Sequence, residues 1–359
     1  MPILHRIALL IVAGAVLFGL LSPQVKPPAD RVAAPVPTGP APAATGKPVS
    51  KPGSKPQARP APQPASAEAA QIKADELGEV PVIMYHRILP RALTSLDRTT
   101  KEFRAELERL ARAGYVPVTA AEFVAGRIDV PAGAHPVVLT FDDGFPSQFA
   151  FDAQGEPEPE SAVGILLDVA RKYPAFRPVA SFYIIKDPFQ LADRAREGIQ
   201  WLVRHGFEVA NHTHTHPNLA AMSETRVRQE VAREETDVVE LTGAHSVTFA
   251  YPYGSPPKKR KWASDGDGWK FQGIFLAGWK PSDSPFLRSF DTFAITRVRS
   301  EGKIKEDGCN QFCSIAWLDW LDNNPDKRFT SDGDPGVVTF PRAKAASLAP
   351  AFADRARIY

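Results

Sequence analysis

The chain has 359 residues and a net charge of +2, from 43 Lys and Arg against 41 Asp and Glu. This length is enough for one large domain or two medium ones. The positive charge is concentrated in residues 24–66, where six basic side chains stand against Asp30, so the rest of the chain is mildly acidic. A mildly acidic globular part without a basic stripe argues against a nucleic-acid-binding protein.

The N-terminus carries an uninterrupted apolar run from Ile7 to Leu21. Its length lies between the core of a signal peptide and a full membrane span. The following SPQVKPP offers no small-x-small cleavage site, which favours a retained signal anchor at residues 1–22 over a cleaved signal peptide. We therefore expect an exported protein, anchored in the inner membrane, whose domain lies in the periplasm or on the outer face of the cytoplasmic membrane.

Residues 23–65 are dominated by Pro, Ala, Lys and small polar residues. Such a composition cannot bury a core and tends towards polyproline II, so it predicts a disordered, semi-stiff linker. Contact of its basic residues with anionic lipid or cell-wall polymer is the less favoured alternative. The globular part is expected to begin near Ser66.

From there, strand-like and helix-like patterns alternate. Short apolar runs at 80–86, 135–141, 179–185, 207–211 and 247–251 predict buried strands, and segments at 101–114, 160–173, 192–206 and 223–243 predict helices. This alternation indicates an α/β fold with a parallel sheet, open or closed into a barrel. The segment 317–321 predicts a packed helix in a C-terminal extension that covers 301–359.

Polar clusters follow four of these strands: MYH, DDG, NHTHTH and YPYG. Active sites of parallel α/β folds lie at the carboxyl ends of the strands, so we expect the four clusters to converge. In TFDDG (140–144) two adjacent carboxylates need a cation, or one of them must take up a proton. Gly144 lets the chain turn sharply after them.

The segment NHTHTHP (211–217) places histidines at alternate positions. On an extended segment His212, His214 and His216 share a face, whereas a tight turn brings His212 and His216 together and points His214 elsewhere. Two imidazoles and one carboxylate with an open position make a catalytic zinc-type ligand set. The alternative is a surface loop with adventitious metal affinity.

Three ordered motifs, TFDDG, the His-Thr-x-x-His-Pro block at 212–217 and FAYPYG at 249–254, resemble the polysaccharide deacetylase family with the NodB homology domain (carbohydrate esterase family 4). VPVIMYHRI (80–88) is similar to the subgroup that acts on poly-N-acetylglucosamine-type exopolysaccharide. The resemblance covers Val80 to Arg299. It implies a distorted (β/α)7 barrel over residues 66–300 and metal-dependent hydrolysis of N-acetyl groups from an N-acetylhexosamine polymer.

The resemblance also implies roles for individual residues. Asp142 matches the general base, and Asp143, His212 and His216 match the ligands of a divalent metal, with zinc expected and cobalt or nickel as alternatives. His214 falls on a variable position of the motif.

Several aromatic residues in or near these motifs are candidates for contact with the substrate. Tyr253 matches the residue whose backbone N–H helps to hold the oxyanion. The rings of Tyr251, Tyr85 and Trp279 are candidates for stacking on sugar, although most aromatic residues of such a domain belong to its core.

The chain departs from the family pattern at two points. The family usually supplies its general acid from a late Leu-His pair, but no histidine follows His245, so His86 in the early strand is the expected acid. The usual arginine that pairs with the base is replaced by Ala250. Arg297 is the candidate to orient Asp142, with Arg299, or no arginine, left open.

Cys309 and Cys313 are the chain's two cysteines, and their spacing suits a disulfide in an exported protein better than a metal or redox pair. The expected partner of the protein is its N-acetylated polysaccharide. Alternatives to the exopolysaccharide deacetylase are a peptidoglycan N-deacetylase, a sugar O-acetyl esterase and a non-catalytic glycan-binding module.

Overall fold

The computed structural model describes residues 62–305 and 308–359. The apolar run Ile7–Leu21 and nearly all of the linker lie outside these residues. Within them, every helix is too short or too polar to cross a membrane. The described residues belong to one compact unit.

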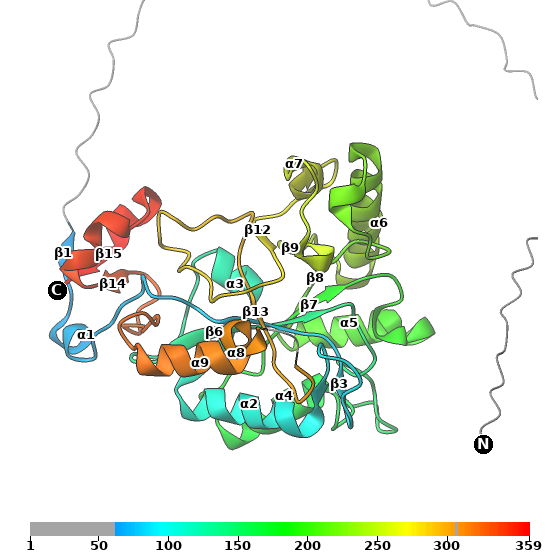
Figure 1. The fold of residues 1–359 in the computed structure, drawn as a ribbon, viewed down its shortest axis with the longest axis horizontal. Coiled ribbons are helices and arrows are strands. Elements are labelled where there is room, and N and C mark those ends of the chain that lie inside the picture. The colour runs from blue at the N-terminus through cyan, green and yellow to red at the C-terminus, as the bar shows by residue number, and fades with distance from the viewer. Residues whose placement is uncertain (1–61, 306–307) are drawn as a thin grey trace, which may run out of the picture. The chain divides into compact units, whose positions relative to one another are not determined.

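A curved parallel sheet forms the centre of this unit (Figure 1). Its seven-strand path runs in the order β12 (Gly273–Phe275), β9 (Thr248–Ala250), β8 (Glu208–Asn211), β7 (Ser181–Ile184), β6 (His135–Asp142), β2 (Val82–Tyr85) and β13 (Val298–Arg299). An eighth strand, β5 (Tyr115–Val118), pairs with the first half of β6, and β7 pairs with its second half. All of these pairings are parallel, so the carboxyl ends of the strands meet at one edge.

The segment that leads into β13 links the two ends of the path. The N–H of Ile274 in β12 donates to the carbonyl of Thr292, and Ile295 forms an isolated bridge with Phe275. Three residues later, Val298 pairs with Ile83 of β2. One stretch of chain is thus bonded to strands from opposite ends of the path, which requires the sheet to curl. The α/β class and the parallel sheet expected from the sequence are confirmed, and the sheet is a curled half-barrel.

Helices cover the outside of this sheet (Figure 1). The principal ones are α2 (Thr100–Arg112), α4 (Ala162–Lys172), α5 (Ala195–Arg204) and α6 (Glu224–Thr242). Thr99 and Glu102 form a full capping box at the start of α2. The expected helices lie within two or three residues of these bounds. Shorter elements are α1 (Ala67–Gln71), α3 (Ala120–Val124), α7 (Lys261–Ser264), β3 (Ile88–Leu89), β4 (Arg98–Thr99), β10 (Asp265–Gly266) and β11 (Trp269–Lys270).

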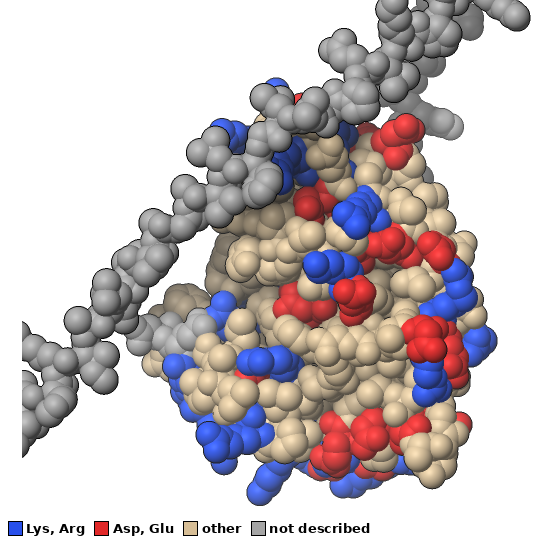
Figure 2. Space-filling model, turned by 90° about the vertical axis from the view of Figure 1, so that its right-hand side faces the viewer, with Lys and Arg blue, Asp and Glu red and all other residues tan. Residues whose placement is uncertain are grey.

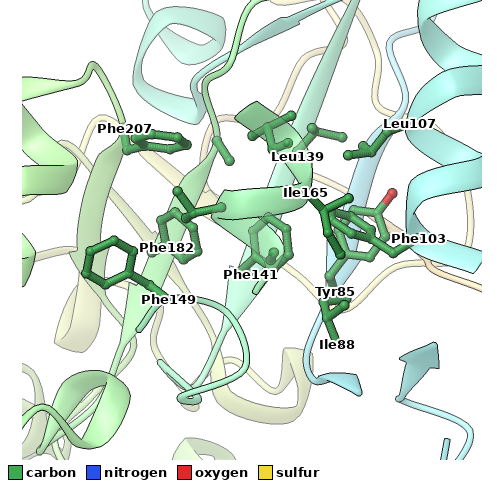
Figure 3. Packing of buried hydrophobic residues seen from close by; sticks show 14 of the residues in the cluster. Tyr85, Ile88, Phe103, Leu107, Leu139, Phe141, Phe149, Ile165, Phe182 and Phe207 are labelled. Carbon is green, nitrogen blue, oxygen red and sulfur yellow. The ribbon is translucent and has the colours of Figure 1, made fainter. Parts of the chain in front are cut away.

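A row of aromatic rings fixes the central strands against α2 (Figure 3). The ring centroids of Tyr85 and Phe141 lie 5.1 Å apart, and those of Phe141 and Phe182 lie 5.0 Å apart, both stacked. Phe103 of α2 meets Tyr85 edge-on. The Tyr85 hydroxyl donates to Glu106 in the same buried layer. Tyr85 is therefore a core residue and is not available to stack on a sugar, because its ring is fully buried.

The C-terminal part contributes to the same fold. It contains α8 (Cys309–Phe312), α9 (Ser314–Asn323), which includes the predicted helix at 317–321, and strands β14 (Val338–Phe340) and β15 (Ala356–Ile358). Phe329 and Phe340 share a buried cluster with Val82 and Phe286. The extension assigned to 301–359 thus shares its core with the sheet.

Two details concern the ends of this part. Gln63–Pro64 form strand β1 beside β15, so the end of the stretch assigned to the linker is built into a small sheet. The Pro-rich pattern of the linker does not reveal this pairing, since proline is tolerated on an edge strand. Cys309 and Cys313 form a disulfide, as their spacing suggested.

Candidate active site

Two carboxylates lie at the carboxyl end of β6. Asp142 is the last residue of the strand and is 2% exposed, while Asp143 adopts φ 76° and starts the turn that Gly144 continues. A positive φ is uncommon for a non-glycine residue and costs backbone energy. The buried Gln148 side chain donates to the carbonyl oxygens of Asp142 and His86, which holds the ends of β6 and β2 together.

Arg297 forms a bidentate ion pair with Asp142. Both guanidinium-to-carboxylate distances are 2.7 Å, and the Arg297 Nε–H donates to the carbonyl of Leu276. The arginine side chain is fully buried. Such a fork fixes the orientation of the carboxylate as well as its charge. The structure thus places Arg297, the candidate from sequence, against Asp142, whereas Arg299 lines a separate hollow beside Trp279.

The neighbouring carboxyls have opposite pKa shifts. Burial alone would raise the pKa of Asp142, but the Arg297 guanidinium, with a contribution from His212, holds it well below its usual range. Burial raises the pKa of Asp143 to about 6, and the charge on Asp142 acts in the same direction. The pair therefore contains one carboxylate that stays ionised and one that binds a proton readily unless a cation is present.

The expected ligands converge on Asp143. Its Oδ1 lies 3.7 Å from Nε2 of His212 and 3.4 Å from Nε2 of His216. Among the described residues this oxygen is buried without a hydrogen-bond partner. The Nδ1–H of His212 donates to the carbonyl of Ala250 at 2.8 Å, because a carbonyl can only accept, and this leaves the Nε2 lone pair facing Asp143.

These residues fit a divalent cation. Asp143, His212 and His216 offer one ligand atom each, all within 4.8 Å of one another. Burial lowers the pKa of His212 to about 3 and also lowers the pKa of His216, so both rings are neutral and able to ligate at pH 7. Two imidazole nitrogens and a carboxylate oxygen are a donor set typical of catalytic zinc.

His214 points away from this group. Thr213 and His216 adopt φ 68° and 55°, so the segment after β8 is a twisted turn and not an extended strand. His214 contacts Glu234 and Asp237 of α6 instead. Of the two geometries considered for NHTHTHP, the tight turn is the one present.

Of the aromatic residues that are candidates for substrate contact, Tyr253 and Trp279 are exposed and Tyr251 is buried. Tyr253, at φ 58° and 66% exposed, has its ring centroid 4.5 Å from that of His216. Trp279 is also half-exposed. Tyr251 is fully buried against Phe249, so its ring is not available to a substrate in this structure. The sequence interpretation of Tyr251 as a substrate-contacting residue is therefore corrected.

His86 follows β2 beside the carboxylate pair. Burial lowers the pKa of its ring, although the charges of Asp142 and Asp143 oppose this shift. The ring is consequently neutral at pH 7 in the free protein. A cavity of about 510 Å³ opens next to Asp143, bordered by Phe145, Lys186 and Gln190, and its volume is in the range of ligand pockets.

Two contributors to the site escaped sequence reasoning. Gln148 has no motif around it that signals its role in joining two strand ends. Thr140 receives a hydrogen bond from Arg297 and donates to the carbonyl of Ile83. The sequence gives one indication of this role for Thr140: it lies two residues before Asp142 and therefore on the same face of the strand.

The fold and the site together define an α/β protein with a carboxylate pair and a His-His-Asp group at the carboxyl edge of its sheet. Residues 129–269 match the family model for polysaccharide deacetylases. The family resemblance drawn from the motifs is thus confirmed for the matched residues, which make up less than half of the chain.

Known proteins show the same likeness. The chain is 24% identical over 166 residues to a peptidoglycan-N-acetylglucosamine deacetylase of Bacillus cereus, covering 46% of this chain and 54% of that protein. It is 22% identical over 232 residues to YxkH of Bacillus subtilis, covering 64% and 75%. The solved deacetylase PplD of Streptococcus pyogenes, bound to acetate, superposes with a TM-score of 0.50 at 17% identity, covering 66% and 98%. The chain spans about half the length of the Bacillus cereus relative.

Proposed function

We propose that this protein is a metal-dependent N-deacetylase that removes acetyl groups from an N-acetylhexosamine polymer. The observation that carries the proposal is the convergence of a buried, arginine-held carboxylate with a separate His-His-Asp cation site at one strand edge. A binding module has no need of an ionised base next to a metal site. A poly-N-acetylglucosamine-like exopolysaccharide is the proposed polymer, since His86 directly follows the early strand β2 and no histidine follows His245 in the sequence.

The residues divide the chemistry among them. Asp143, His212 and His216 would hold a divalent cation, which would polarise the acetyl carbonyl and make the attacking water more acidic. Asp142, ionised and oriented by Arg297, accepts the proton of that water. The backbone N–H of Tyr253 stabilises the charge that develops on the carbonyl oxygen. His86 takes up a proton from solvent once the substrate is bound and gives it to the nitrogen of the departing amine as the C–N bond breaks, and Asp142 returns its own proton to solvent when acetate leaves.

The test is acetate release from the purified chain of residues 1–359. N-acetylglucosamine oligomers with β-1,6 and β-1,4 linkages, peptidoglycan and an O-acetylated sugar would each be assayed with zinc, cobalt or nickel. We expect release from the β-1,6 oligomers. Release from peptidoglycan alone would favour the activity in the Bacillus cereus relative's name. Release from the O-acetyl sugar alone would identify an esterase, and binding without release a glycan-binding module.

His86→Gln is expected to lower kcat by about 10²-fold, at the lower end of the effects of general acids. The decrease in kcat should be larger for N-acetyl substrates than for activated aryl acetates, because an aryl alcohol leaves without being protonated. Equal losses on both substrates would contradict the acid role. His205→Gln is the matched control, since that exposed histidine stacks on Trp201 in α5, away from the site.

The affinity for zinc at this site is expected to fall as pH falls through 6. Protons compete with the metal for ligands, and Asp143, with its pKa raised to about 6, is the ligand that becomes protonated in this range. The pKa of His212, about 3, lies below this range, so protonation of Asp143 alone should raise the dissociation constant about tenfold per pH unit below pH 6. Competition with a chromophoric chelator from pH 7.5 to 5 measures this, with His216→Ala identifying the site. An affinity that stayed constant from pH 7.5 to 5 would contradict the assignment.

The exported, membrane-anchored location is also a proposal. The apolar run Ile7–Leu21 supports it, as does the disulfide between Cys309 and Cys313, because disulfides persist in oxidising compartments. Fractionation of cells expressing the chain, with protease added to intact spheroplasts, would test it.

A further inference from the structure

A second group of potential ligands lies on the far side of the histidine segment. Nδ1 of His214 is 3.3 Å from a carboxylate oxygen of Glu234 and 3.2 Å from one of Asp237. Glu234 and Asp237 are three residues apart on α6 and share one face of that helix. The ligand atoms of the three residues lie within 4.8 Å of one another.

Nδ1 of His214 forms a long hydrogen bond with Glu234, at 3.3 Å, and its separations from Glu234 and Asp237 also suit a shared metal. Hydrogen bonds between a charged nitrogen and a carboxylate are usually about 2.7–2.9 Å long. Ligands about 2.0–2.1 Å from a tetrahedral zinc are about 3.3 Å apart. Both separations of His214 match the edge of such a tetrahedron.

Glu234 supplies an independent indication. Its side chain is fully buried, and its Oε1 is without a hydrogen-bond partner among the described residues. A buried carboxylate oxygen left unpaired costs free energy unless a cation or a proton satisfies it. Glu234 also borders a cavity of about 250 Å³, which gives a cation an entry path and room for a water.

The surroundings of this cavity carry excess negative charge. Glu234, Asp237, Asp187 and Glu240 line it together with one basic residue, Lys186. Glu240 is already paired with Arg196. On the side of the molecule that bears α5 and α6, acidic side chains form several groups among the basic ones (Figure 2). The remaining carboxylates beside His214 are therefore not balanced by the side chains that line the cavity.

We propose that His214, Glu234 and Asp237 form a second site for a divalent transition-metal cation such as zinc, distinct from the site at Asp143. Glu230 supports it, because its carboxylate accepts hydrogen bonds from the backbone and hydroxyl of Thr215 and so fixes the loop beside α6. A cation here joins that loop to α6. His214 lies between His212 and His216, so the same cation also steadies the segment that carries the two proposed ligands of the first site.

Counting zinc bound to the untagged chain of residues 1–359 tests the proposal. After equilibration with zinc chloride and removal of free metal, mass spectrometry of the digested protein should find two zinc ions per chain. Asp237→Asn and His214→Gln should each leave one, His216→Ala should leave the other, and Asp237→Asn with His216→Ala should leave none. Because these measurements concern metal content, they are independent of whether the protein deacetylates any polymer.

Glu240→Gln is the matched control, since this carboxylate lines the same cavity but belongs to an ion pair with Arg196. It should keep both zinc ions. Asp237 is 41% exposed, so its replacement by Asn is compatible with folding, which circular dichroism would verify. One zinc in the wild type and one in Asp237→Asn would overturn the proposal, as would two in Asp237→Asn. Loss of zinc in Glu240→Gln would also overturn it, by indicating adsorption to an acidic surface.

Discussion

Asp142→Asn is expected to lower kcat for the proposed deacetylation by roughly 10²–10⁴-fold, the range typical of general base catalysis. Asparagine keeps the shape of the side chain and one acceptor for Arg297, but it cannot take a proton from water. Metal binding at the proposed first site should remain, because Asp143, His212 and His216 are the proposed ligands. Steady-state kinetics and metal content, measured on the same preparation, distinguish loss of the base from loss of the metal.

The matched control is Asp168→Asn. Asp168 is also paired with arginine, on the outer helix α4, and is half-exposed. Its replacement should leave kcat unchanged and stability within about 1 kcal/mol of the wild type, the usual range for an exposed ion pair. A variant Asp142→Asn that retained more than a tenth of the wild-type kcat would remove Asp142 from the base role.

Arg297→Met is expected to destabilise the fold by about 3–5 kcal/mol, the cost of breaking a buried ion pair by removing one partner. Asp142 would be left ionised and 2% exposed, with hydrogen bonds to the guanidinium lost. Without the arginine charge, burial dominates and the pKa of Asp142 rises. Chemical denaturation at pH 7 measures the change in the free energy of unfolding.

Arg297→Met is also expected to change the pH dependence of kcat/KM. In the wild type, the folded-state pKa of Asp142 lies below its unfolded value, so its stabilising contribution is present above pH 4 and lost as pH falls through the folded pKa. In Arg297→Met, assayed with enough zinc to keep the first site filled at each pH, the acidic limb of the kcat/KM profile should therefore move to higher pH. Arg297→Lys should restore the charge but not the bidentate geometry, and so recover stability only in part. An unshifted acidic limb in Arg297→Met would show that the arginine does not set the protonation of the base.

Several parts of the fold could be predicted because their signals are local. The strands that carry DDG and NHTHTH are apolar runs bounded by polar residues, and α2 has a capping box and helical spacing. The strands β12 and β13 were missed, because two or three residues contain no period to detect. Their hydrogen bonds to β9 and β2 connect distant parts of the chain, and such pairing produces no recognisable pattern in the local sequence.

The site shows the same division. Strand alternation puts Phe249 and Tyr251 on one face and Ala250 on the other, so the burial of Tyr251 depends on which face meets the core. The sequence alone does not reveal which face is buried, because that depends on where the neighbouring elements pack. The choice between Arg297 and Arg299 likewise depended on where β13 joins β2.

The sequence by itself determined the residue types of the site and their order: paired carboxylates after one strand, alternate histidines after another, and a PYG turn after a third. The tertiary structure decided which of them meet. It joined Arg297 to Asp142 across 155 residues, turned His214 towards α6 and buried Tyr251. The physical reason is that spacing along the chain governs local geometry, whereas ion pairs, ligand groups and burial depend on how strands and helices distant in sequence pack together.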